Sequence, residues 1–220
     1  MSQQIDVAAG GSGQSTIDRS LEGRTGESRL ADPGAWAITA FATTSFALGI
    51  YNANLINGKG VAIVIPFALF FGGLIQIIVG VLEICRGNVF GAVVFGTYGP
   101  FWVIYGMIET LYGSSIPPAA LNSALSLFLA LFAVLTFYFL IASFKTDMVL
   151  IGVFALILAG LILLSIGAGE KWIDVTRAGG WVTLAFAVLA WYHAAGSVIS
   201  STYGRTVLPM GSLRRVTPGR

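Results

Sequence analysis

Long apolar runs constrain the fold of this chain more than any other feature of its sequence. A membrane-spanning helix needs about 20 mostly apolar residues to cross the hydrocarbon of a bilayer. Six runs of about that length are present, and the breaks between them hold Gly, Asn, Pro or charged residues, which are typical of turns. We therefore expect an all-α integral membrane protein whose six transmembrane helices form a pore-containing bundle. The expected spans are 35–56, 61–84, 92–112, 119–142, 148–168 and 179–200.

Charged residues are scarce and gather outside these runs. They make up 10% of the 220 residues, whereas a soluble domain carries about 25%. Residues 1–32 hold half of the acids among Gly, Ser and Gln and contain no apolar run, so we expect a disordered N-terminal tail there. Residues 33–203 then form the six-helix transmembrane domain, and residues 204–220 form a basic C-terminal tail.

The positions of Lys and Arg predict the orientation, because cytoplasmic segments of membrane proteins are enriched in these residues. With six spans, both tails share one side with the second–third and fourth–fifth breaks, and nine Lys and Arg lie on that side. The opposite side holds Lys59, Lys171 and Arg177. We expect a multi-pass protein of the plasma membrane with both termini in the cytoplasm.

The chemistry-bearing residues are too few for most enzymes. The chain has one histidine, one cysteine and no HExxH, GxSxG or phosphate-binding GxxxxGK[ST] pattern. The sequence therefore predicts that the protein is not an enzyme and that it has no metal or cofactor site. The net charge of +2, without a basic stretch, argues against a nucleic-acid partner. A secondary transporter, a channel or a structural membrane protein remains.

Polar residues line one face of the first span. Thr44 and Ser45 lie three and four residues after Phe41, and Leu48 and Asn52 continue at spacings of three and four, which places all five on one stripe of a helix. Such hydroxyl and amide groups can line a narrow pathway and donate hydrogen bonds to a small anion. The alternative is that they bind only to a neighbouring helix.

Four further candidate site residues with polar side chains lie in the later spans. Gln76 lies among glycines at four-residue spacing, which favours close helix packing. Glu83 precedes Arg86 by three residues, so a local ion pair is favoured over a proton carrier. Glu109 lies at headgroup depth or in the pathway. His193, expected near the middle or outer-middle of the lipid, either relays protons or binds a neighbouring helix.

Tyr98 lies in the third span between Gly96 and Gly99. Small residues on both sides leave room for its ring to fill a gap between helices, while its hydroxyl reaches a ligand or a backbone carbonyl.

These stretches resemble the acetate uptake transporter family, also called the GPR1/FUN34/YaaH family. Residues 71–102, FGGLIQIIVGVLEICRGNVFGAVVFGTYGPFW, are similar to the family's run of Phe-Gly-Gly, Gln, Gly, Glu, Gly-Asn-x-Phe-Gly and Tyr-Gly-x-Phe-Trp. Residues 40–53 and 204–211 also resemble family segments. The family's first-helix signature, Asn-Pro-Ala-Pro-Leu-Gly, is replaced here by Asp-Pro-Gly-Ala-Trp-Ala at residues 32–37.

The resemblance implies a function as well as an architecture. It implies a homo-hexameric ring in which each protomer has its own narrow pore for acetate and, in some members, succinate or other short carboxylates, either proton-coupled or channel-like. The family's hydrophobic constriction corresponds to Phe41, Tyr98 and Ile157, the last in place of a leucine. Two alternatives stay open: a channel for ammonia or another small neutral solute, and a non-transporting membrane sensor or scaffold.

Overall fold

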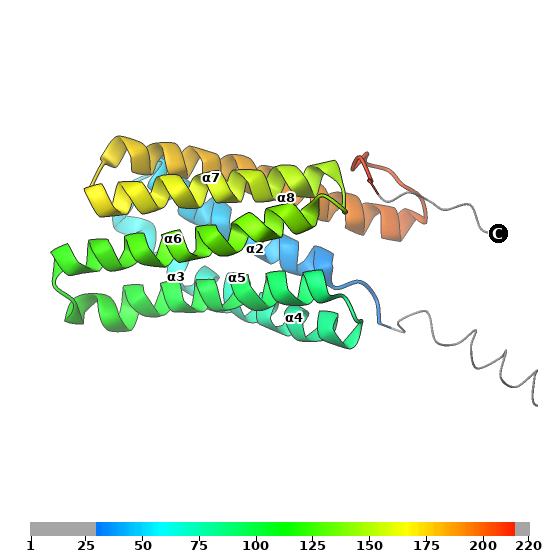
Figure 1. Ribbon diagram of the computed structural model, residues 1–220, viewed down its shortest axis with the longest axis horizontal. Coiled ribbons are helices and arrows are strands. Elements are labelled where there is room, and N and C mark those ends of the chain that lie inside the picture. The colour runs from blue at the N-terminus through cyan, green and yellow to red at the C-terminus, as the bar shows by residue number, and fades with distance from the viewer. Residues whose placement is uncertain (1–29, 214–220) are drawn as a thin grey trace, which may run out of the picture. The chain divides into compact units, whose positions relative to one another are not determined.

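A computed structural model describes residues 30–213 of the chain. Residues 1–29 of the predicted N-terminal tail and residues 214–220 of the predicted C-terminal tail lie outside the described residues. The described part is built from helices, which confirms the all-α prediction (Figure 1). Its elements are α2 (Gly34–Asn52), η1 (Gly58–Ile63), α3 (Val64–Pro66), η2 (Phe67–Leu74), α4 (Ile75–Cys85), α5 (Val89–Met107), η3 (Ile108–Tyr112), η4 (Gly113–Ser115), α6 (Pro118–Ser143), α7 (Met148–Glu170) and α8 (Ile173–Tyr203).

The short elements join the longer ones into membrane-length helices. Elements η1, α3, η2 and α4 follow one another without a break, and so do α5, η3 and η4. Element η2 is π-helical and begins directly after Pro66, a residue that cannot donate a backbone hydrogen bond. The first helix is shorter than expected, because Asn54 has a left-handed φ of 56° two residues after α2 ends. The last helix is longer, since α8 begins at Ile173 directly after the turn at Lys171.

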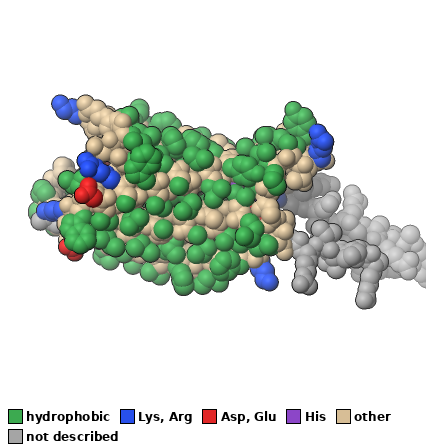
Figure 2. Space-filling view, turned by 90° about the horizontal axis from the view of Figure 1, so that it is seen from above, with side chains coloured by type: hydrophobic (Ala, Val, Ile, Leu, Met, Phe, Trp, Pro, Cys, Tyr) green, Lys and Arg blue, Asp and Glu red, His purple; other side chains and the backbone are tan. Residues whose placement is uncertain are grey.

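Five of these continuous helices are long and apolar enough to cross a membrane. Helix α2 is not among them, because its hydroxyl-bearing stripe lowers its hydropathy. Seven residues of α2 are nevertheless buried against its neighbours. On the face shown in Figure 2, charged side chains lie toward the two ends and hydrophobic side chains cover the surface between them. This distribution fits a protein that is surrounded by lipid.

The long helices pack side by side around a common interior. Helix α2 packs against α8, α8 against α7, and α7 against α6, while α4 and η2 pack against both α5 and α2 (Figure 1). The α4–α5 pair is very close, since a Cβ on Gly80 would lie 2.9 Å from the backbone nitrogen of Gly96. Between α5 and α6 the backbones touch little, and aromatic rings fill the space. The ring centres of Phe101 and Phe128 are 5.0 Å apart.

Residues 209–213 form a segment that we call the C-terminal strap. The backbone N–H of Met148 donates to the carbonyl of Gly211 at 3.1 Å, and the N–H of Leu213 donates to the carbonyl of Thr146 at 3.0 Å. The strap is also held to α8, where the hydroxyl of Tyr192 donates to the carbonyl of Pro209 at 2.9 Å. It is thus tied to the turn between α6 and α7 and to the last helix.

Candidate functional site

Two cavities lie end to end inside the bundle. We name them after the orientation expected from the sequence: the cavity of about 240 Å³ that contains Glu109 is called the outer cavity, and the cavity of about 560 Å³ that contains Asp147 is called the inner cavity. Three residues line both of them: Phe41 from α2, Tyr98 from α5 and Ile157 from α7. The structure thus brings together, from three helices, the residues that the family resemblance assigns to a constriction.

The constriction formed by these three residues is tightly packed and apolar. Phe41 is 8% exposed, and Tyr98 and Ile157 are each 4% exposed. The rings of Phe41 and Tyr98 have their centres 5.3 Å apart, and Phe186 of α8 stacks on Phe41 at 5.7 Å. Apolar constrictions of this kind can gate a pore by disfavouring water and hydrated ions.

The hydroxyl of Tyr98 is engaged by α6 rather than by a backbone carbonyl of a neighbouring helix. Its oxygen lies 2.7 Å from Oγ1 of Thr136, and the Thr136 hydroxyl in turn donates to the carbonyl of Phe132 at 2.7 Å. Thr136 is fully buried. Sequence reasoning missed Thr136, because a lone threonine carries no sign of which helix it faces.

The hydroxyl groups on the polar stripe of α2 differ in whether they have a hydrogen-bond partner. The Thr44 hydroxyl donates to the carbonyl of Ala40 one turn earlier, at 2.9 Å, so it is not a free donor. Ser45 lines the outer cavity, and its buried hydroxyl has no partner among the described residues. The buried indole N–H of Trp102, which also lines this cavity and which the sequence did not single out, likewise has no partner in the described part of the chain.

The remaining residues of the α2 stripe and several charged residues lie at the far end of the outer cavity. Asn52 and Leu48 line the outer cavity, and Asn52 also lines a third cavity of about 610 Å³ that contains Lys171 and Arg177. Glu109 lies in η3, is exposed, and lines the outer cavity. Charges of both signs therefore stand at this end of the bundle, where Arg177 also pairs with Asp174 at 3.3 Å.

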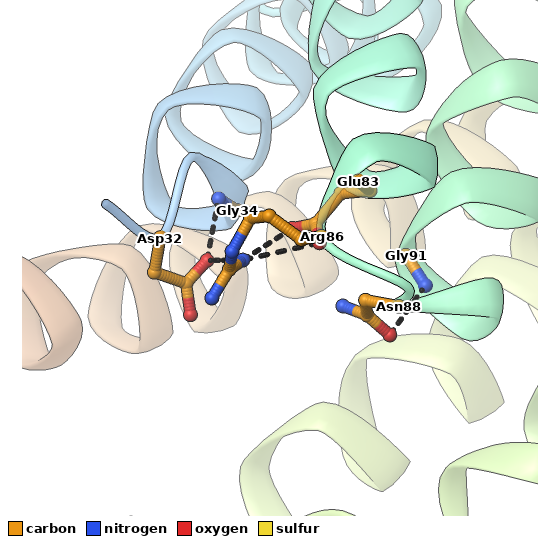
Figure 3. A network of polar contacts seen from close by, with 6 residues as sticks. All are labelled: Asp32, Gly34, Glu83, Arg86, Asn88 and Gly91. Atoms are coloured by element: carbon orange, nitrogen blue, oxygen red, sulfur yellow. Dashed lines mark hydrogen bonds and ion pairs between the residues drawn. The ribbon is translucent and has the colours of Figure 1, made fainter. Parts of the chain in front are cut away.

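A buried ion pair stands beside the inner cavity (Figure 3). The guanidinium of Arg86 contacts both carboxylate oxygens of Glu83 at 3.1 Å, as the three-residue spacing predicts. The same nitrogen contacts Asp32 at 3.0 Å, and Asp32 also accepts a hydrogen bond from the N–H of Gly34 at 2.9 Å. Asp32 and Glu83 line the inner cavity together with Gln76, whose amide donates to the carbonyl of Gly72 at 2.6 Å.

His193 contacts Asp147, the residue that precedes α7. Its Nε2 is 3.1 Å from a carboxylate oxygen of Asp147, which precedes α7 and caps it by accepting from the N–H of Leu150 at 2.9 Å. Helix α8 is 31 residues long, and the depth of His193 in the lipid stays a prediction. Burial works to raise the pKa of Asp147, but the hydrogen bonds from His193 and Leu150 hold it below its usual value.

Comparisons with known proteins show the family of the chain. A family model described as the GPR1/FUN34/yaaH family matches residues 20–214. The chain is 31% identical over 186 residues to the succinate-acetate/proton symporter SatP of Escherichia coli K12, covering 84% of this chain and 98% of the relative. It is also 31% identical over 178 residues to the ammonia transport outward protein 2 of Saccharomyces cerevisiae, covering 77% of this chain and 62% of that one.

A solved structure shares the fold. The structure described as the bacterial acetate channel SatP superimposes with a TM-score of 0.76 at 31% identity, covering 83% of this chain and all of that one.

Proposed function

We propose, because this chain belongs to the GPR1/FUN34/yaaH family, that it transports acetate and other short carboxylates such as succinate across the membrane. The observation that carries the proposal is the pair of cavities separated by Phe41, Tyr98 and Ile157. The relative SatP is named for succinate and acetate, and the similar solved structure is described as an acetate channel.

The electrostatics of the pathway suit a weakly held organic acid. The constriction carries no charged side chain, and moving a bare carboxylate into an apolar medium costs tens of kcal/mol by simple Born solvation. The substrate must therefore either carry its proton or be supplied with hydrogen-bond donors. Weak binding at such a constriction favours passage over retention.

We propose that the orientation and assembly follow the sequence expectations. Both termini face the cytoplasm, which places Asp32, Arg86 and the C-terminal strap on the cytoplasmic side, and six protomers form a ring with one pore each. Labelling of a cysteine introduced at Gly58 or at Ser212, in a protein whose exposed Cys85 is replaced by Ser, from either side of sealed vesicles tests the orientation. Native mass spectrometry of the detergent-solubilised protein tests the number of subunits.

Labelled acetate uptake into proteoliposomes tests the transport function. We expect uptake above that of protein-free vesicles, a loss of uptake in Tyr98→Ala, and entry of larger carboxylates in Phe41→Ala, because the second change widens the constriction. A matched control, Phe70→Ala, changes a phenylalanine that is 65% exposed on the outside of the bundle and leaves size selectivity unchanged. Proteoliposomes no more permeable to acetate than empty ones would refute the proposal.

A second candidate is ammonia transport, which the likeness to the yeast protein favours. The same vesicles separate the two functions, since an ammonia pathway alkalinises the lumen after addition of ammonium salt and leaves acetate uptake at the level of empty vesicles.

A further inference from the structure

The hydrogen-bond chain at the constriction fixes which group donates. Thr136 has a single hydroxyl proton, and that proton is directed to the carbonyl of Phe132 at 2.7 Å. The 2.7 Å contact between Tyr98 and Thr136 then has Tyr98 as its donor, because a hydroxyl supplies one proton and two acceptor lone pairs. The Tyr98 oxygen consequently faces its surroundings as an acceptor.

No free donor remains among the side chains of the constriction. Phe41 and Ile157 have no N–H or O–H group in their side chains, and Phe186, which stacks on Phe41, has none either. A carboxylate is an acceptor only, whereas an undissociated carboxylic acid has an O–H to donate. A carboxylate at this point would meet lone pairs and apolar rings, while a neutral acid would donate to Tyr98.

From this arrangement we infer that Thr136 is a positioning residue that sets the charge state of the transported species, so that the constriction passes the undissociated acid and rejects the carboxylate. This inference rests on the proposed function and deepens it. Its consequence is that each acid molecule carries its own proton through a static pore, which gives proton-coupled, electroneutral flux without a moving carrier.

Other titratable groups can alter the pH profile of uptake, but they leave its electrical character unchanged. For this reason the decisive readout is current rather than pH dependence alone. The titratable groups that line the two cavities are Asp32, Glu83, Lys145, Asp147 and His193 on the inner side and Tyr105 and Glu109 on the outer side. Tyr138 also lies near the constriction, because it contacts Phe139, whose ring packs against Tyr98.

The test combines labelled uptake with electrical recording on the reconstituted full chain, with acetate as the only permeant anion. For the wild type we expect uptake above empty vesicles, falling about tenfold for each pH unit above the acid's pKa, which is close to that of Glu at about 4.3. We expect no acetate current. If the anion itself passed, accumulation would change about tenfold for each 59 mV of membrane potential.

The variant Thr136→Val tests the positioning role, because it removes the acceptor of the Tyr98 proton while keeping the size of the side chain. We expect it to gain an acetate current that reverses at the equilibrium potential of acetate, because the freed Tyr98 hydroxyl can then donate to a carboxylate. The conservative variant Thr136→Ser restores electroneutral uptake. The role of Thr136 is overturned if Thr136→Val carries no acetate current although it takes up acetate like the wild type and has the same elution volume in size-exclusion chromatography.

The outcomes separate this inference from the proposed function. Wild-type uptake that is accompanied by an acetate current overturns the inference and leaves acetate transport standing. Uptake that never exceeds that of empty vesicles, at any pH, overturns both.

Discussion

The two ion pairs of Arg86 have nearly equal lengths and very different surroundings, so they should contribute unequally to stability. The contacts to Glu83 and Asp32 measure 3.1 Å and 3.0 Å, but the Glu83 side chain is 2% exposed and the Asp32 side chain 73% exposed. Breaking a buried pair by removing one partner costs about 3 to 5 kcal/mol, because an uncompensated charge stays behind. An exposed pair contributes about 0 to 1 kcal/mol.

We therefore expect Arg86→Ala to lower the free energy of unfolding by about 3 to 5 kcal/mol, whereas Asp32→Asn lowers it by less than about 1 kcal/mol. The double variant Glu83→Gln/Arg86→Ala should recover much of the loss, since no buried carboxylate is left without a partner. Reversible denaturation in mixed micelles, followed by tryptophan fluorescence, measures all three. Equal losses for Arg86→Ala and Asp32→Asn would refute the argument from burial.

Three further predictions follow from the packing and the polar groups. Gly80→Val should destabilise the α4–α5 pair by about 1 to 3 kcal/mol, because the valine side chain would meet the backbone of Gly96. The control is Gly58→Ala, since Gly58 has open space around it. Thermal unfolding measures both variants. Ser45→Ala should leave stability unchanged or raise it by about 1 kcal/mol while acetate uptake falls; a clear loss of stability would mean that the hydroxyl has a partner. The folded-state pKa of Asp147 lies below its ordinary value of 3.8. The contribution of Asp147 to stability is therefore complete above pH 3.8 and is lost as the pH falls through the lower folded pKa. Over that range, the melting temperature of Asp147→Asn should fall less than that of the wild type.

The spans could be predicted because the bilayer imposes a length on every apolar run. The end of α2 could not, since the left-handed residue Asn54 ends the helix inside an apolar run. The partner of His193 could not be predicted either. Its contact with Asp147 joins residues 46 positions apart, and tertiary packing decides such a pairing.

The candidate site was only partly accessible from the sequence. Helical spacing alone placed Phe41 and Ser45 on one face, because that information is local. Ile157 entered through the family resemblance, since nothing in its span distinguishes it from its apolar neighbours. The partnership of Tyr98 with Thr136 joins residues 38 positions apart on two different helices, and such a pairing is decided by tertiary packing rather than by any local pattern.

The packing of α2 against α8 joins the first and the last long helix of the described chain. During synthesis, the first helix enters the membrane about 150 residues before α8 is complete. At translation rates of roughly 5 to 20 residues per second, that interval lasts roughly 8 to 30 s. Throughout it, the hydroxyl-rich first helix lacks the neighbour that covers it in the finished bundle. The wall of the bundle that α2 and α8 form together is therefore complete only near the end of synthesis.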